Sequence, residues 1–300
     1  MTTRSMISFD WAMKRLLRNK ANFEVLEGFL SELLRRKIII KQIGESESNK
    51  DSENDKYNRV DIFVEADDKE LVIVELQYDN EDDYFQRMLY GVSKSITEHI
   101  HKNDPYSNVR KVYSINIVYF DLGTGDDYVY YGNTGFKGLH TQNELQLSAK
   151  QQQLYGKTYI GEFYPEYYII KVKKFNDVAK NTLDEWIYYL KNNQIRDEFT
   201  AQGLDKAREI LAFDNLTDKE KKEYLRSVEE KRIRNSEIHT AFTDGEIKGR
   251  TEGEAERNKL KSEKEAIQTE KEAALKLATE QAMRIAELER MLSNNNLNKE

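Results

Sequence analysis

The chain has 300 residues, of which 38% are hydrophobic and 11% aromatic, enough for one sizeable folded domain and an extension. It has no cysteine, which excludes disulfide frameworks, thiolate zinc sites and cysteine nucleophiles. The net charge of −7 is uneven, because basic residues outnumber acidic ones in 1–44 and acids gather in 45–83. Local patches decide phosphate binding, so nucleic acid stays a possible partner. No run approaches the ~20 apolar residues of a membrane span, so we expect a cytoplasmic protein without a membrane partner.

The first predicted element is a helix over 11–35. Its apolar residues recur at helical spacing; they are Phe23, Leu26, Leu30, Leu33 and Leu34. A strand over 38–43 follows, and the polar run 44–56 is predicted to be a loop.

Two apolar, β-branched runs, 59–65 and 71–77, are separated by a short polar break and predict a β-hairpin. Folding the hairpin at its centre pairs residues whose numbers sum to 136. Asp61 then faces Glu75, with Cβ atoms about 4.5–5.5 Å apart. Gln77 projects from the same face, because side chains alternate along a strand. We expect the N-terminal helix to cover this edge of the sheet.

Two carboxylates this close repel each other unless one is protonated or a cation lies between them, and a divalent metal is the sharpest explanation. The alternative is a structural one, in which the acids reach solvent or pair with an arginine such as Arg59. The apolar neighbours of Glu75 indicate a strand buried on both faces, and a buried acid needs a partner.

A second helix is predicted over 82–102, with Arg87 and Tyr90 on neighbouring faces. Arg87 follows the hairpin directly and is a candidate for contacting a phosphate, although a plain surface arginine fits equally well. His99 and His101 point in different directions on this helix, which favours structural roles.

Strands over 112–120 and 167–172 and a helix over 183–191 follow, with short strands and loops between 128 and 165. Helix, hairpin, helix and strand in this order predict an α/β core with a mixed sheet flanked by helices.

The C-terminal third is highly charged. Residues 217–220 form a capping box that opens a helix, and apolar residues recur by sevens from 260 onward, which favours a coiled coil and a homo-oligomer over a lone solvated helix. Gly245, Gly249 and Gly253 weaken a helix and predict a flexible joint. The expected domains are a core over 1–200, a helical linker over 201–255 and a coiled-coil tail over 256–300.

The motif Asp61, hairpin, Glu75-x-Gln77 resembles the PD-(D/E)xK nuclease superfamily, and in particular the Rpn family of recombination-promoting nucleases and transposases. The similarity covers roughly 8–255 and extends to the segments 22–30, 84–90, 112–118 and 186–191. It implies a restriction-endonuclease-like fold and Mg²⁺-dependent DNA cleavage, with Mn²⁺ as a substitute. Two positions depart from the superfamily motif: Val60 replaces a proline, and Gln77 replaces a lysine.

The resemblance also implies roles for individual residues. Asp61 and Glu75 would hold the metal, with Glu27 of the first helix as a further candidate ligand, and Gln77 would orient the attacking water. Arg87 and Tyr90 would contact DNA.

Two other function classes stay open. One is an RNase H-like transposase that uses Asp61, Asp121 and a later acid such as Glu185. The other is an interaction protein that keeps the fold without catalysis and works through its tail.

Overall fold

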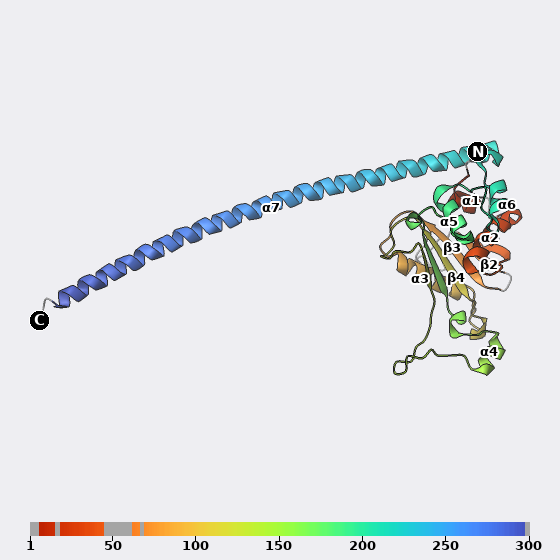
Figure 1. Cartoon of the computed structure of the whole chain (residues 1–300), viewed down its shortest axis with the longest axis horizontal. Coiled ribbons are helices and arrows are strands. Elements are labelled where there is room, and N and C mark those ends of the chain that lie inside the picture. The colour runs from red at the N-terminus through yellow and green to blue at the C-terminus, as the bar shows by residue number, and fades with distance from the viewer. Residues whose placement is uncertain (1–5, 16–18, 45–61, 67–68, 298–300) are drawn as a thin grey trace. The chain divides into compact units, whose positions relative to one another are not determined.

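A computed structural model of the chain describes residues 6–15, 19–44, 62–66 and 69–297 (Figure 1). The chain divides into two compact units, Met1–Tyr224 and Leu225–Glu300. The first unit contains a six-stranded mixed sheet with the order β1-β2-β3-β4-β6-β5. The prediction of an α/β core with a mixed sheet is therefore confirmed.

The centre of the sheet is parallel and its margins are antiparallel. Strands β3, β4 and β6 run parallel, whereas β1, β2 and β5 pair antiparallel with their neighbours. The bounds are Ile40–Gly44 for β1, Ile62–Ala66 for β2, Leu71–Gln77 for β3, Val112–Val118 for β4, Val129–Gly132 for β5 and Glu166–Lys171 for β6. Every residue of β4 is buried, as expected for a central strand covered on both faces.

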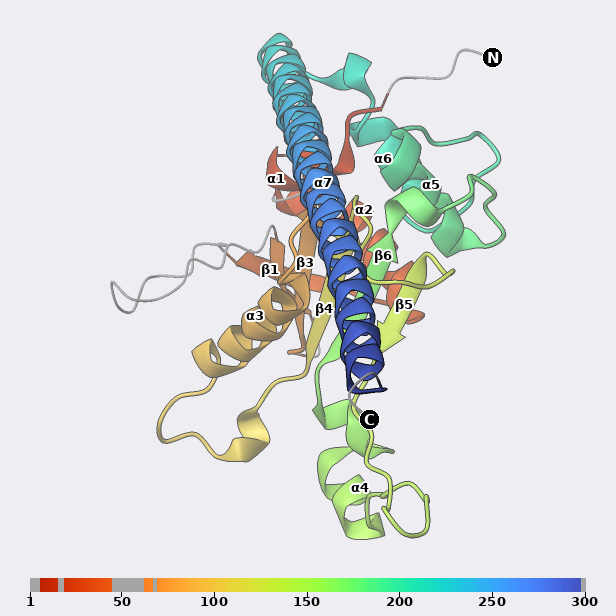
Figure 2. The same ribbon diagram turned by 90° about the vertical axis from the view of Figure 1, so that its left-hand side faces the viewer.

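Helices cover both faces of the sheet. The helices on the sheet faces are α1 (Phe9–Arg15), α2 (Phe23–Leu34), α3 (Tyr84–Glu98), α5 (Thr182–Asn192) and α6 (Leu204–Ile210), whereas α4 (Ala149–Tyr155) lies beyond one end of the sheet (Figure 1). The even-numbered residues of β3, such as Val74, join the main core with Phe29 of α2 and Trp186 of α5. On the other face, Ile73 packs with Val92 of α3. Figure 2 shows α3 and α5 apart from one another, on either side of the strands.

The N-terminal helix differs from its prediction. In place of one helix over 11–35 there are α1, a short 3-10 turn at Lys20–Asn22, and α2. The side chain of Asn19 accepts a hydrogen bond from the Ala21 N–H at 3.1 Å, which favours a new helix start over continuation of the old one. Helical periodicity within α2 concealed this interruption.

The core continues past the expected boundary at residue 200. Leu204, Ala207 and Leu211 of the α6 region are fully buried in the main core. The turn before α6 approaches α2 so closely that a Cβ on Gly28 would lie 2.3 Å from the Gln202 carbonyl oxygen. At the end of this unit, the Tyr224 hydroxyl accepts a hydrogen bond from the Ser8 N–H at 3.3 Å.

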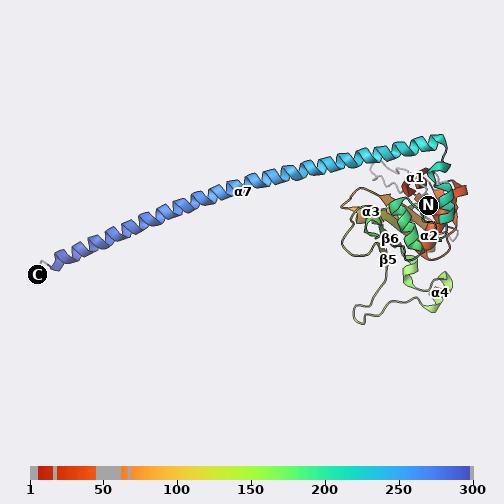
Figure 3. The ribbon, with the colours of Figure 1, turned by 45° about the horizontal axis from the view of Figure 1, so that its top comes forward.

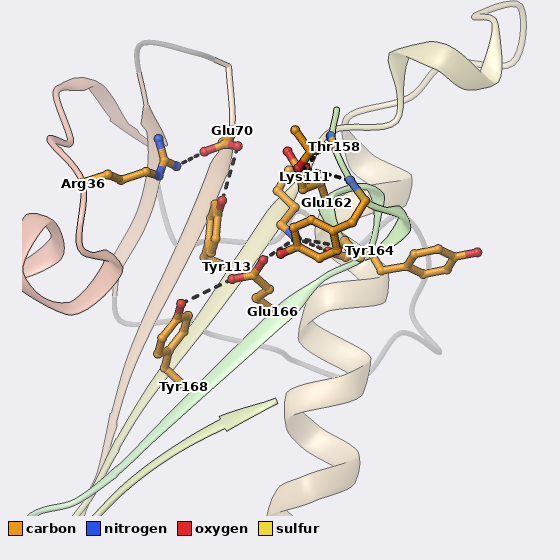
Figure 4. A network of polar contacts seen from close by, with 11 residues as sticks. Arg36, Glu70, Lys111, Tyr113, Thr158, Glu162, Tyr164, Glu166 and Tyr168 are labelled. Carbon is orange, nitrogen blue, oxygen red and sulfur yellow. Dashed lines mark hydrogen bonds and ion pairs between the residues drawn. The ribbon is translucent and has the colours of Figure 1, made fainter. Parts of the chain in front are cut away.

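The segment between β5 and β6 carries α4 and extends beyond one end of the sheet (Figures 1 and 3). Lys111 anchors its base: the Nζ donates to the carbonyl oxygens of Gly161 and Tyr164 at 3.0 and 2.5 Å, and it pairs with Glu166 at 2.8 Å (Figure 4). Both side chains of this ion pair are buried. Charge compensation therefore holds this segment to the start of β4 and β6.

A long helix, α7 (Asp218–Leu297), includes the whole described part of the second unit. The predicted capping box is confirmed, since Thr217 N–H donates to Glu220 at 2.8 Å and Glu220 N–H donates to the Thr217 hydroxyl at 3.3 Å. Gly245, Gly249 and Gly253 lie within α7 and do not end it. No described helix is both long enough and apolar enough to cross a membrane.

Candidate functional site

The candidate site lies on the face of β3 that α3 covers. Glu75 and Gln77 have the same parity as Ile73, which packs against α3, so all three share this face. Glu75 is 4% exposed, in a strand whose residues from Leu71 to Leu76 are all buried. A carboxylate in this environment requires a cation or a set of hydrogen-bond donors.

Arg87 of α3 supplies that cation in this structure. Its Nη2 pairs with Glu75 Oε1, and its Nη1 donates to both carboxylate oxygens of Glu81 at 2.7 and 3.0 Å. Arg87 follows the first turn of α3 and Glu81 precedes the helix, so the helix start aligns both residues with the end of β3. The guanidinium therefore bridges two carboxylates.

Gln77 belongs to the same network. Its Nε2 donates to Glu81 Oε1 at 2.8 Å and to the Asp79 carbonyl oxygen at 3.2 Å. Glu81 thus orients both Gln77 and Arg87. The sequence prediction did not include Glu81, whose only signal is its place in the acidic run before α3.

The two carboxylates set the charge state of Arg87. Burial alone would lower the pKa of Arg87, but the negative charges of Glu75 and Glu81 outweigh burial and raise it. Arg87 is therefore a cation placed between two carboxylates.

A second polar residue lies next to Glu75 on the neighbouring strand. Asn116 of β4 is the cross-strand partner of Glu75 and is buried. Its Nδ2 donates to the Ser114 hydroxyl at 3.0 Å, and its Oδ1 accepts from the Tyr84 hydroxyl at 3.3 Å. Asn116 looked like part of an apolar strand in the sequence, and only the pairing of β3 with β4 reveals its position.

The predicted hairpin register is confirmed over the described part of the hairpin. All four pairs from Ile62↔Val74 to Glu65↔Leu71 have numbers that sum to 136. Asp61 itself lies outside the described residues, as does Arg59.

Glu27 makes a contact that the sequence did not predict. Its Oε1 accepts a hydrogen bond from the Ile40 N–H of β1 at 2.7 Å, so it connects α2 to the edge of the sheet. The buried residues of α2 join the core on the face opposite Ile73, and α3 covers the Glu75 face instead of the N-terminal helix. This corrects the expectation that the N-terminal helix lies over the carboxylates.

Tyr90 lies on α3, whereas His99 and His101 follow its last residue, Glu98, so the helix ends before the predicted boundary at 102. Tyr90 is 39% exposed, whereas Arg87 on the same helix turns toward β3. His99 stacks on Phe63 with ring centroids 5.0 Å apart, and its Nδ1 lies 2.7 Å from the Ser95 carbonyl oxygen. These contacts agree with the predicted structural role of His99.

Two of the three acids of the RNase H-like alternative, Asp121 and Glu185, lie within the described residues, and Asp61 lies outside them. Glu185 Oε2 accepts hydrogen bonds from the Thr200 and Ala201 N–H groups at 2.7 and 2.6 Å, which gives it a structural role. Asp121 is exposed. Within the described ranges, no three His, Asp or Glu side chains are placed to share a metal ion.

Comparison with known proteins agrees with this fold. A family model described as a PD-(D/E)XK nuclease family transposase matches residues 7–241, which includes the whole sheet and its helices. Neither the curated proteins nor the solved structures gave a significant match. Members of this nuclease family typically use divalent metals. The chain belongs to the PD-(D/E)XK nuclease family of transposases.

Proposed function

We propose that this protein is a metal-dependent DNA endonuclease that acts in recombination or in the movement of a mobile element. The observation that carries the proposal is Glu75, a buried carboxylate near the end of β3 that shares one sheet face with Gln77 and pairs with Arg87. The family match supports a nuclease or mobile-element role.

The residues present suit a hard divalent cation. Carboxylate oxygens are the ligands that Mg²⁺ and Mn²⁺ prefer. If the register observed from Ile62 to Glu65 continues by one pair, Asp61 faces Glu75. We propose that these two residues hold Mg²⁺, with Mn²⁺ as a substitute, and that Glu27 supports the strand next to them through Ile40. A bound metal would lower the pKa of a water and polarise the phosphate.

Gln77 and Arg87 are then assigned to water and phosphate. The amide of Gln77, held by Glu81, can orient a water by hydrogen bonding but cannot carry charge. When Glu75 is neutralised by another cation, Arg87 can turn from Glu75 to a phosphate oxygen, for which its planar guanidinium is well suited. Tyr90, on the exposed side of the same helix, is proposed to contact DNA.

Cleavage of supercoiled plasmid DNA tests this proposal. The parent is expected to nick or linearise the plasmid with Mg²⁺ or Mn²⁺ and to stop in EDTA. Asp61→Ala and Glu75→Ala should reduce the rate by orders of magnitude, because each removes a metal ligand. Gln77→Ala should lose roughly 1–3 kcal/mol of transition-state stabilisation, the size of one buried hydrogen bond.

Glu98→Ala is the matched control, since Glu98 is an exposed acid on α3 that pairs only loosely with Lys94 at 3.7 Å. It should cleave like the parent. Cleavage that survives EDTA, or an Asp61→Ala protein as active as the parent, contradicts the nuclease proposal.

The non-catalytic alternative is favoured by one observation, the neutral Gln77 at the position where the motif has lysine. In that case the tail, residues 256–300, would carry the function through its interactions. We propose self-association through 256–300 under either function, because Leu260, Ile267 and Leu288 lie on α7 at multiples of seven residues and are more than half exposed.

A further inference from the structure

Lys171, the last residue of β6, is a buried lysine on the same sheet face as the candidate site. It is 2% exposed. Its Nζ donates to the Gly123 carbonyl oxygen at 3.1 Å and lies 5.9 Å from the centroid of the Tyr130 ring. Both contacts are with neutral groups, and within the described structure no ion pair includes Lys171. A buried charge with neutral partners is expensive, so its retention requires an explanation.

The position of Lys171 in the sheet suggests one. Gln77 pairs with Val118 of β4, and Val118 pairs with Lys171 of β6. The three residues therefore form a single row across parallel strands and point to the same face. At about 4.8 Å per strand, the Cα atoms of Gln77 and Lys171 are about 10 Å apart.

Asn116 and Glu75 belong to the row of paired residues that lies two residues earlier along each strand. Glu75 pairs with Asn116, and Asn116 pairs with Ile169 of β6, two residues before Lys171. Lys171 is thus at the same end of the sheet as the Glu75 network, on the far side of Val118. Its Nζ reaches Gly123, where an added Cβ would lie 3.7 Å from Phe85 of α3. Gly123 therefore lies near both the ammonium group and Phe85, the second residue of α3.

We propose that Lys171 supplies, from two strands away, the positive charge that Gln77 lacks. Its field would stabilise negative charge developing on a phosphate bound at the Glu75 network. Lys171 does not touch the phosphate in this proposal and is a positioning residue. The inference rests on the proposed nuclease function.

A structural role is the competing explanation. The segment that covers Lys171 carries Asp121, Asp126 and Asp127, all of which are exposed. If Lys171 served mainly to offset these acids and hold the segment, its replacement by an apolar residue would destabilise the fold. If it serves the site, an apolar residue of equal length should leave the melting temperature unchanged or higher.

The test compares Lys171→Met, Gln77→Lys, the double variant, and Lys173→Met as the matched control, because Lys173 is an exposed lysine two residues away. If the developing charge is as far from Lys171 as the Cα of Gln77 is, about 10 Å, a unit charge at an effective dielectric near 20 corresponds to roughly a tenfold change in rate. Lys171→Met should therefore lower kcat about tenfold with little change in KM for DNA. The loss should be much smaller in the Gln77→Lys background. Substitutions this far apart normally add, so non-additivity would reveal the shared role.

A Mn²⁺ titration by calorimetry provides a readout that does not need cleavage. Removing the positive charge should tighten Mn²⁺ binding severalfold in Lys171→Met and leave Lys173→Met at the parent value. A parent that binds Mn²⁺ but cleaves no DNA would refute the nuclease function alone, and the shift in Mn²⁺ affinity would still decide whether the charge of Lys171 acts on the site. Unchanged kcat and Mn²⁺ affinity in Lys171→Met, a lowered melting temperature in that variant, or a parent that does not bind Mn²⁺ would overturn the proposal.

Discussion

The ion pair between Arg87 and Glu75 makes a prediction that does not depend on catalysis. Arg87→Met keeps the length of the side chain and removes the cation from a carboxylate that is 6% exposed. Removing one partner of a buried pair costs about 3–5 kcal/mol. The Arg87 side chain is 30% exposed, which moves the expected loss to about 2–3 kcal/mol. For a unit of this size, that loss corresponds to a drop in melting temperature of about 4–12 °C.

Tryptophan fluorescence is the appropriate assay. The two tryptophans, Trp11 and Trp186, are buried in the first unit, so their signal reports the sheet and not the second unit. Glu75→Gln provides the second arm of a double-mutant cycle, because it removes the charge that Arg87 neutralises and keeps the shape. In the Glu75→Gln background, Arg87→Met should cost less than half as much.

Divalent cations supply a further check on the same variants. A cation that binds only the folded state at 100 times its Kd stabilises it by about 2.7 kcal/mol. Mg²⁺ should therefore raise the melting temperature of Arg87→Met more than that of the parent, since Glu75 no longer has Arg87 as its counter-charge. Equal losses from Arg87→Met in the parent and Glu75→Gln backgrounds would refute the ion-pair reasoning.

Three further predictions concern the fold, its pH dependence and the tail. Gly28→Ala should lower the free energy of unfolding in urea by more than about 2 kcal/mol, because the new Cβ would collide with the backbone of residues 202–203. Gly245→Ala adds a Cβ with nothing within 4 Å of it and should stabilise α7 by up to about 1 kcal/mol. Burial raises the pKa of Glu65, but the positive charges of Arg110, at 3.2 Å, and Lys41 outweigh burial and leave this pKa below its ordinary value. Glu65→Gln should therefore reduce stability at neutral pH, and unfolding curves of the two proteins should converge as the pH falls through the lowered pKa of Glu65. Deleting 256–300 should leave tryptophan fluorescence unchanged and lower the sedimentation mass; a truncated protein with the same ratio of measured to monomer mass as the parent would contradict the coiled coil.

The sequence alone determined the elements whose physics is local. The β-branched runs flanking the break at 66–70 specify a hairpin, and the register follows from its centre, which is why four cross-strand pairs could be predicted without a structure. The same holds for the capping box at Thr217 and Glu220, where the signal and the contact are three residues apart. The pairing of Asp61 with Glu75 follows from this register and stays a prediction.

Only the tertiary structure decided which groups gather around Glu75. Glu81 comes from the turn before α3 and Asn116 from β4, and parallel pairing joins residues separated by long crossovers that periodicity cannot relate. The side of the sheet covered by each helix is likewise a packing outcome, which is why α3 and not the N-terminal helix covers Glu75. Packing between distant segments also sets the end of the first unit at Tyr224. Helix α6 packs against α2, and only the folded chain brings Gly28 against residues 202–203.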